Sequence, residues 1–181
     1  MKKLLLASMM ILSAVSAHAG DIKPVLGIDY TYSDIGLKNG WGYVAENKYN
    51  SFNLSAGFKA GKYVGMEAFF QHSDKKDGTY TMYGPIQTSF YALGADMIGY
   101  LPIQEKLNLL GTVGFGYYNV KAELAHYEES ENGLGIRLGT GVQYDLTDNI
   151  ALRTVARYVK PVGFDTIDDI MEVSAGIRFN F

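Results

Sequence analysis

The chain lacks several features that would assign it to common protein classes. It has 181 residues with no cysteine and only four prolines. The absence of cysteine excludes disulfide bonds as a source of stability. After an apolar run near the start, no second run approaches the ~20 apolar residues that a membrane-spanning helix needs. No apolar stripe with the 3.6-residue period of a helix is long enough to predict a helical domain.

The apolar run belongs to a segment with the organisation of a secretory signal peptide. Two lysines near the start precede an uncharged stretch from Leu4 to Val15, and Ala17 and Ala19 form an A-x-A cleavage pattern. The stretch is about a dozen residues long and is too short to span a bilayer as a helix. We therefore expect residues 1–19 to be a signal peptide and residues 20–181 to be one exported domain.

An excess of positive charge is also missing. Once the two leader lysines are removed, 14 basic residues remain beside 19 acidic ones, and the formal charge moves from -3 to -5. Nucleic-acid-binding proteins are usually basic, so we expect no nucleic-acid partner. The abundant residues are 21 glycines, 14 tyrosines and 9 phenylalanines. This composition is typical of an all-β protein with tightly curved strands.

Apolar residues alternate with polar ones along eight segments. In the last segment every second residue from Met171 to Phe181 is apolar, and the residues between them are polar or glycine. The same alternation occurs over residues 26–32, 52–60, 64–70, 91–101, 107–117, 134–144 and 150–158, and no position of the apolar face is charged. Side chains alternate between the two faces of a strand, so the two faces meet different surroundings. A lipid exterior and a wet lumen provide these surroundings.

The opposite face carries an equal number of acidic and basic residues. These ten residues are Asp29, Lys59, Glu67, Asp96, Arg137, Asp145, Arg153, Arg157, Glu172 and Arg178. Charges inside a narrow lumen are costly unless they are paired. The balance therefore predicts a lumenal charge network, although the sequence does not assign the individual pairs.

Short and long connections alternate between the predicted strands. The short turns are at Gly61-Lys62, Pro102–Lys106 and Thr147–Asn149. The long loops are Asp34–Lys48, Ser73–Gln87, Lys121–Asn132 and Lys160–Asp169. Outer-membrane barrels have short periplasmic turns and long extracellular loops. The sequence thus predicts an all-β fold, an eight-stranded antiparallel up-and-down transmembrane β-barrel.

A water-soluble barrel with the apolar face turned inward is the alternative. Its interior would have to hold more Phe, Tyr, Leu and Ile side chains than eight strands readily enclose. Tyrosines also gather near the strand ends, as expected of girdles at membrane interfaces. Both observations favour the membrane orientation.

Residues 133–160 carry a recognisable hairpin pattern. Its parts are Gly141-Val142-x-Tyr144, the turn Thr147–Asn149, Leu152-Arg153 and Arg157-Tyr158. The pattern resembles the small outer-membrane β-barrel family that includes the OmpA transmembrane domain and opacity-like porins. The resemblance implies a Gram-negative outer membrane with its lipids and lipopolysaccharide as surroundings. It also implies that Phe179 and Phe181 form the signal read by the barrel-assembly machinery.

Catalytic groups are sparse outside the leader. His72 is followed by Ser73 and Asp74, but consecutive strand residues point to alternate faces and do not form a triad. His126 lacks the Ser-Asn that follows it in lipid A deacylases. The acidic stretches near Glu129 and Asp168 lack the spacing of a calcium loop. We therefore expect no enzyme activity, no cofactor and no metal site.

These features predict a monomeric outer-membrane protein with a structural or surface-interaction role through its extracellular loops. Its host or surface ligand is not identified by the sequence. An eight-stranded barrel is filled by side chains, and several large inward residues narrow it further. These are Phe69, Ile98, Tyr100, Tyr118 and Val155. A narrow porin-like channel for small solutes is the alternative function, and a lipid A-modifying enzyme is the third.

Overall fold

The computed structural model describes residues 22–181 except 38–46, 82–83, 125–126 and 165. The predicted signal peptide with Ala17 and Ala19, and also His126, lie outside the described residues. The strands are β1 (Ile22–Leu37), β2 (Lys48–Ala60), β3 (Val64–Ser73), β4 (Lys76–Thr81), β5 (Gly84–Gln104), β6 (Leu107–Leu124), β7 (Tyr127–Asp145), β8 (Ile150–Val162) and β9 (Ile167–Asn180). The described residues include no helix that is long and apolar enough to cross a membrane.

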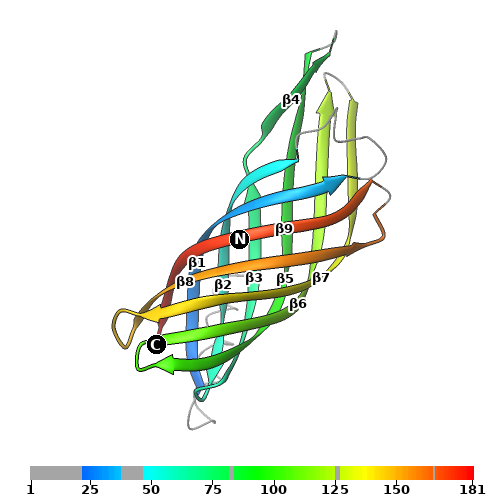
Figure 1. The fold of residues 1–181 in the computed structure, drawn as a ribbon. Helices are drawn as coiled ribbons and strands as arrows, with labels where there is room; N and C mark the ends of the chain where they lie inside the picture. Colours follow the sequence, from blue (N-terminus) through cyan, green and yellow to red (C-terminus); the bar gives the residue numbers. More distant parts are fainter. Residues whose placement is uncertain (1–21, 38–46, 82–83, 125–126, 165) are drawn as a thin grey trace, which may run out of the picture.

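Eight of these strands close into a barrel. Each strand pairs antiparallel with its neighbours in the order β3-β2-β1-β9-β8-β7-β6-β5, and pairing between β3 and β5 closes the ring. The strand β4 pairs only with β5 and lies beyond the barrel wall (Figure 1). The predicted eight-stranded antiparallel barrel is therefore confirmed. Closure leaves no free strand edge within the wall, as a lipid surrounding requires.

The two faces of the wall divide as the alternation predicted. Residues of the predicted apolar face point outward, and Ile28, Phe52 and Phe115 are 51%, 63% and 62% exposed. Residues of the charged face are buried in the lumen, where Arg137 is 1% exposed. Near one end of the wall the outward side chains include Tyr32, Tyr91, Tyr117 and Tyr158. The outside therefore forms an apolar band with tyrosines at one edge, which suits a bilayer interface.

The short connections lie at one end of the barrel, here called the turn end. They are Gly61–Tyr63, Glu105-Lys106 and Leu146–Asn149. Gly61 has a φ of 61°, a left-handed conformation that costs glycine no steric strain. The predicted turn Pro102–Lys106 is too long, because β5 continues to Gln104. Pairing of Gln104 with Leu107 past a local bulge explains this extension.

The opposite end, here called the loop end, contains more strand than predicted. The predicted loop Lys121–Asn132 is mostly paired strand, because β6 runs to Leu124 and β7 starts at Tyr127. The predicted loop Ser73–Gln87 contains β4 and its hairpin with β5. The sequence of these segments has no regular alternation of apolar and polar residues, so it gives no strand signal there. The strands continue there through backbone pairing.

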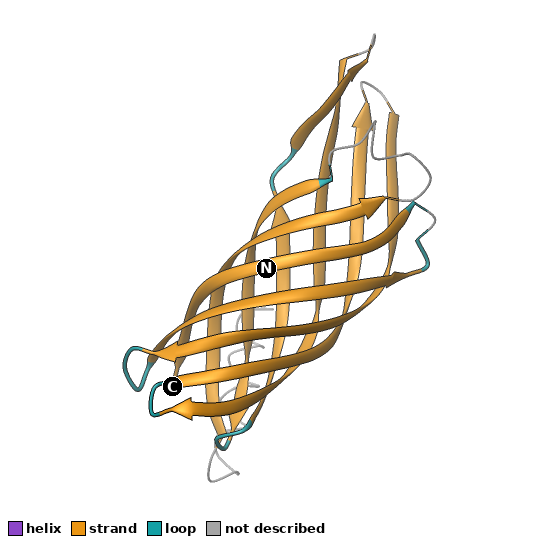
Figure 2. Ribbon diagram, in the orientation of Figure 1, coloured by secondary structure: helices purple, strands orange, loops and turns teal. Residues whose placement is uncertain are grey.

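The longest strands extend well past the apolar band. The strands β5, β6 and β7 have 21, 18 and 19 residues. A tilted membrane-spanning strand needs only ~9–11. Figures 1 and 2 show these strands and β4 rising as a sheet from one side of the loop end. We call this part, built from β4 and the ends of β5, β6 and β7, the projecting sheet.

Candidate functional site in the lumen

All ten residues of the predicted charge network face the lumen. Eight of them are at most 6% exposed, and Lys59 and Asp145 are partly exposed near the turn end. The eight buried residues form two clusters, each with two arginines and two carboxylates. The turn-side cluster contains Asp29, Glu67, Arg153 and Arg178, and the central cluster contains Asp96, Arg137, Arg157 and Glu172.

The turn-side cluster is tightly bonded around two carboxylates. Arg178 donates from Nη1 and Nη2 to the two oxygens of Asp29 at 2.7 and 2.9 Å. Its Nε also donates to Glu67 at 3.2 Å, and Arg153 donates to the other Glu67 oxygen at 2.7 Å. The hydroxyl of Ser55 donates to Glu67 at 3.0 Å. Charge-assisted and bidentate bonds of this kind are the strong ones in proteins.

The central cluster is more loosely arranged. Arg137 lies 3.2 Å from Asp96 and 3.4 Å from Glu172, and Arg157 lies 3.5 Å from Asp96. The guanidinium of Arg137 stacks 3.8 Å from the ring centroid of Phe69. Arg157 donates to the hydroxyl of Ser174 at 2.9 Å. Cation–π stacking and hydrogen bonds thus supplement the longer ion pairs.

Glycines in the wall make room for the arginines. A Cβ on Gly27 would lie 2.6 Å from Cζ of Arg178, and one on Gly139 would lie 2.8 Å from Cγ of Arg157. Both separations are shorter than van der Waals contact allows. Because each cluster has equal numbers of opposite charges, it buries its arginines without a net charge. The lumen at this level is filled by paired side chains.

Toward the loop end the lumen contains a cluster of buried apolar side chains. This loop-end plug consists of Ile35, Tyr49, Phe69, Phe90, Ala92, Tyr118, Val159, Phe164, Ile167 and Ile170, with Val120 packed against it. The rings of Tyr49 and Phe90 meet edge to face at 5.4 Å between centroids. Tyr118 connects the plug to the central cluster, because its hydroxyl accepts a hydrogen bond from Arg137 at 3.1 Å.

The sequence predicts only part of the plug. Phe69 and Tyr118 were expected to narrow the interior, whereas Tyr49, Phe90 and Phe164 were not. Tyr49 and Phe90 lie just outside the predicted strand segments, and Phe164 lies within a predicted loop. A large apolar residue on the otherwise polar face, next to a strand end, is the signal that would have located Tyr49 and Phe90.

His72 and Ser73 do not converge. His72 faces outward and stacks against Phe70 with 6.5 Å between ring centroids. Ser73 faces the lumen, where its hydroxyl accepts a hydrogen bond from the backbone of Phe90 at 2.8 Å. Within the part of the chain that the structure describes, no three His, Asp or Glu side chains are grouped so that they could hold a metal ion.

Phe179 and Phe181 lie on the outer face at the turn end. Phe181 is 66% exposed, and its backbone nitrogen donates to the carbonyl oxygen of Pro24 at 3.0 Å. Phe179 pairs with Leu26 on one side and Ile150 on the other. This position leaves the terminal aromatic ring accessible to lipid or to another protein. Its role in assembly stays a prediction.

The family model for the outer membrane protein beta-barrel domain matches residues 4–181. The chain belongs to this family. It is therefore a β-barrel protein of the Gram-negative outer membrane, as the resemblance implied. In such barrels the short turns face the periplasm and the long loops face the cell exterior. The turn end is accordingly periplasmic, and the loop end with its projecting sheet is extracellular.

The fold of this chain is similar to solved structures of small outer-membrane barrels. Ail, the attachment invasion locus protein of Yersinia pestis, is 18% identical with a TM-score of 0.64, and the match covers 89% of this chain and 99% of Ail. Neisserial surface protein A is 18% identical with a TM-score of 0.66, and the match covers 88% and 97%. OprG from Pseudomonas aeruginosa is 12% identical with a TM-score of 0.56, covering 91% and 97%. No curated protein matches the sequence.

Proposed function

We propose that this protein is a surface-interaction protein that acts through its projecting sheet and does not form a channel. The observation that carries the proposal is the length of paired strand outside the apolar band. Beyond Tyr117, seven more residues of β6 pair with β7, and the last of these pairs is Leu124 with Tyr127. These seven residues add about 23 Å of strand, measured along the chain. A protein that only had to span the bilayer would have no need of this extension.

The projecting sheet is also fixed to the rest of the extracellular end. The backbone nitrogen of Thr166, in the connection between β8 and β9, donates to Glu131 on β7 at 3.1 Å, and the Thr166 hydroxyl bonds to the same carboxylate. Beyond the band, outward positions become polar, with Ser89 on β5, Lys121 on β6 and Asn132 on β7. A rigid, polar sheet raised above the membrane suits contact with another surface at little cost in ordering.

The charge of the loop end favours a partner with cationic contact groups. The four predicted loop segments contain eleven acidic and six basic residues. Ail of Yersinia pestis has been crystallised with the heparin analogue sucrose octasulfate. A net negative loop end repels such a polyanion, so we propose that this protein prefers basic protein surfaces.

The first test replaces part of the projecting sheet. Tyr118 and Gly133 are directly paired, so replacing residues 119–132 with Asn-Gly leaves a two-residue hairpin and keeps the pairing of β6 and β7 up to Tyr118. In nanodiscs of zwitterionic lipid we expect the wild-type protein to bind a surface coated with a basic protein and not a heparin surface. The shortened variant is expected to lose this binding while keeping its resistance to SDS before heating. Equal binding by both proteins, or a preference for heparin, would contradict the proposal.

The second test concerns conduction. Both arginine clusters and the loop-end plug fill the lumen, and this opposes the alternative of a narrow channel. We expect the folded protein, inserted in planar lipid bilayers, to give no stable discrete conductance steps. Heat-dependent mobility on SDS gels of the same preparation verifies that the barrel is folded. Reproducible unitary steps from that preparation would favour the channel instead.

A further inference from the structure

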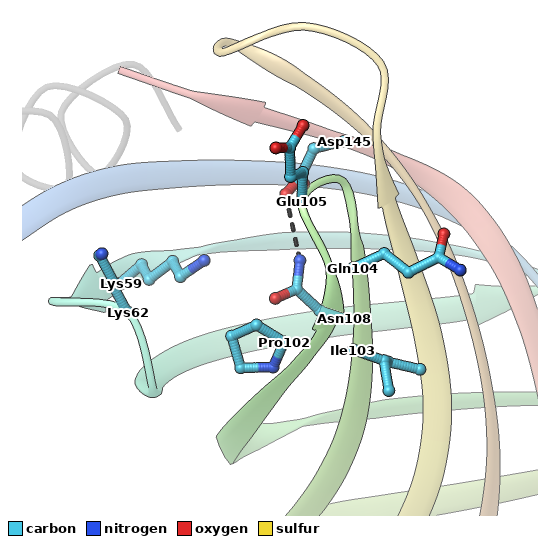
Figure 3. A pocket seen from close by; sticks show the side chains of 8 residues that line it. All are labelled: Lys59, Lys62, Pro102, Ile103, Gln104, Glu105, Asn108 and Asp145. Atoms are coloured by element: carbon cyan, nitrogen blue, oxygen red, sulfur yellow. Dashed lines mark hydrogen bonds between the residues drawn. The ribbon is translucent and has the colours of Figure 1, made fainter.

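The periplasmic mouth of the barrel contains a pocket that the surface role does not use. Its volume is about 430 Å³, within the ~300–1,000 Å³ of small-molecule sites. It is lined by Lys59, Lys62, Pro102, Ile103, Gln104, Glu105, Asn108 and Asp145 (Figure 3). These residues come from β2, β5, β6, β7 and the turns between them. The pocket lies at the end of the lumen that is opposite to the projecting sheet.

Opposite charges face each other in this pocket without touching. Figure 3 shows Lys59 and Lys62 on one side and Glu105, Asn108 and Asp145 on the other. Each of the four lumenal arginines has a carboxylate within 3.5 Å. Lys59 has no ion pair with any described residue, and its ammonium lies 4.3 Å from the ring centroid of Tyr100. Lys59 and Asp145 are therefore the two members of the lumenal network that are not paired with an opposite charge.

The carboxylate of Asp145 is held in place by neighbouring amides. Asn108 donates to Oδ2 at 3.1 Å, and Gln143 donates to Oδ1 at 2.8 Å. Gln143 is itself fixed, because its own oxygen accepts hydrogen bonds from Arg153 at 2.8 and 3.1 Å. Each carboxylate oxygen has a second lone pair, so Asp145 can accept a further donor without rearrangement. This makes it a pre-organised acceptor at the edge of the pocket.

The side of the pocket that faces Asp145 has an excess of positive charge. Lys23 on β1 is the direct cross-strand partner of Lys59 on β2, and Lys62 follows in the next turn. Like charges at directly opposed positions destabilise a strand pair. A bound anionic group would relieve this repulsion. A simple anion would also approach Glu105 and Asp145, however, and a simple cation would approach the lysines.

We propose that the periplasmic mouth binds a small zwitterion, an amino acid or short peptide with a free amine and a free carboxylate. The carboxylate contacts Lys59 and Lys62, and the ammonium contacts Asp145, with Glu105 beside it. One ligand of this chemistry satisfies both walls at once. The contacts are stronger than on an open surface because Lys59 and Asp145 are partly withdrawn from water.

The probe for the test is the dipeptide Ala-Ala, added to isotope-labelled full chain refolded in detergent micelles. We expect saturable NMR shifts at amides around Lys59, Gln104 and Asp145. The N-acetylated dipeptide, which lacks the ammonium, and the dipeptide amide, which lacks the carboxylate, are each expected to bind about 10- to 100-fold more weakly, as the loss of a charged hydrogen bond implies. Equal shifts with a blocked dipeptide, or tighter binding of phosphoethanolamine than of the dipeptide, would overturn the proposal.

Variants at the two ends of the barrel provide a matched comparison. Lys59→Met and Asp145→Asn are expected to weaken dipeptide binding at least about tenfold. Lys62→Ala changes an exposed turn residue and is expected to weaken binding in a barrel that folds normally. The controls Lys160→Met and Asp168→Asn remove the same charge types at the extracellular end, where they pair at 2.8 Å, and should leave binding unchanged. Unaltered affinity in the Lys59 and Lys62 variants would refute the site.

Discussion

Replacing Arg178 with alanine is expected to lower the free energy of unfolding of the refolded barrel by about 3–5 kcal/mol, the cost of leaving a buried charge unpaired. Arg178 is 1% exposed and bonds both Asp29 and Glu67. Glu67 keeps Arg153 after the substitution, but Asp29 loses its only ion pair in the described structure. Denaturant unfolding in detergent or lipid measures the change.

The control for this prediction is a salt bridge outside the lumen. Lys160→Ala breaks the pair with Asp168, whose side chains are 52% and 56% exposed. Exposed pairs contribute only about 0–1 kcal/mol, so this variant should unfold nearly as the wild type does. The double variant Asp29→Leu with Arg178→Met should recover much of the lost stability, because an apolar replacement leaves no unpaired charge. Equal destabilisation by Arg178→Ala and Lys160→Ala would show that the lumenal pairs do not stabilise the barrel.

Deleting Phe181 is expected to remove most of the folded protein from the outer membrane of cells while refolding in detergent continues. Burial of one aromatic side chain contributes only about 1.5–3 kcal/mol, too little to prevent folding of a closed barrel. If the terminal aromatic residue is read by the assembly machinery, its loss affects a step that refolding in vitro does not include. The measurement compares heat-modifiable, surface-accessible protein in cells with the refolding yield of the purified chain.

Tyr63 provides the matched control for Phe181. It is also an aromatic residue at the turn end, and it is 63% exposed, close to the 66% of Phe181. Tyr63→Ala removes a similar lipid contact without altering the terminal strand, so it should leave cellular assembly intact. Similar losses in cells and in vitro after deletion of Phe181 would mean that this residue only packs against lipid.

The surface role and the small-molecule site are proposed for opposite ends of the barrel. The loop-end plug and the arginine clusters separate the extracellular sheet from the periplasmic pocket. Each role is therefore tested by changes at its own end, at residues 119–132 for the surface role and at Lys59, Lys62 and Asp145 for the pocket.

The sequence by itself determined the class of fold and the two faces of the wall. Alternation between neighbouring residues is a local property, and a one-residue slip would move every apolar side chain into the lumen. For this reason the outward position of Phe115 and the inward position of Arg137 could be predicted without any knowledge of strand pairing. The balance of lumenal charge could be counted in the same way.

Only the tertiary structure decided which charges meet and where the strands end. Asp29 and Arg178 are 149 residues apart, and Glu67 and Arg153 are 86 apart, so their contacts depend on barrel closure and on the stagger between strands. The same closure leaves Lys59 and Asp145 on opposite sides of a pocket. Beyond the apolar band the sequence of β6 and β7 no longer alternates between apolar and polar residues, although the backbone pairs continue. The alternation of residues along a strand depends only on the surroundings of its two faces. The ion pairs across the lumen depend instead on the geometry of the closed barrel.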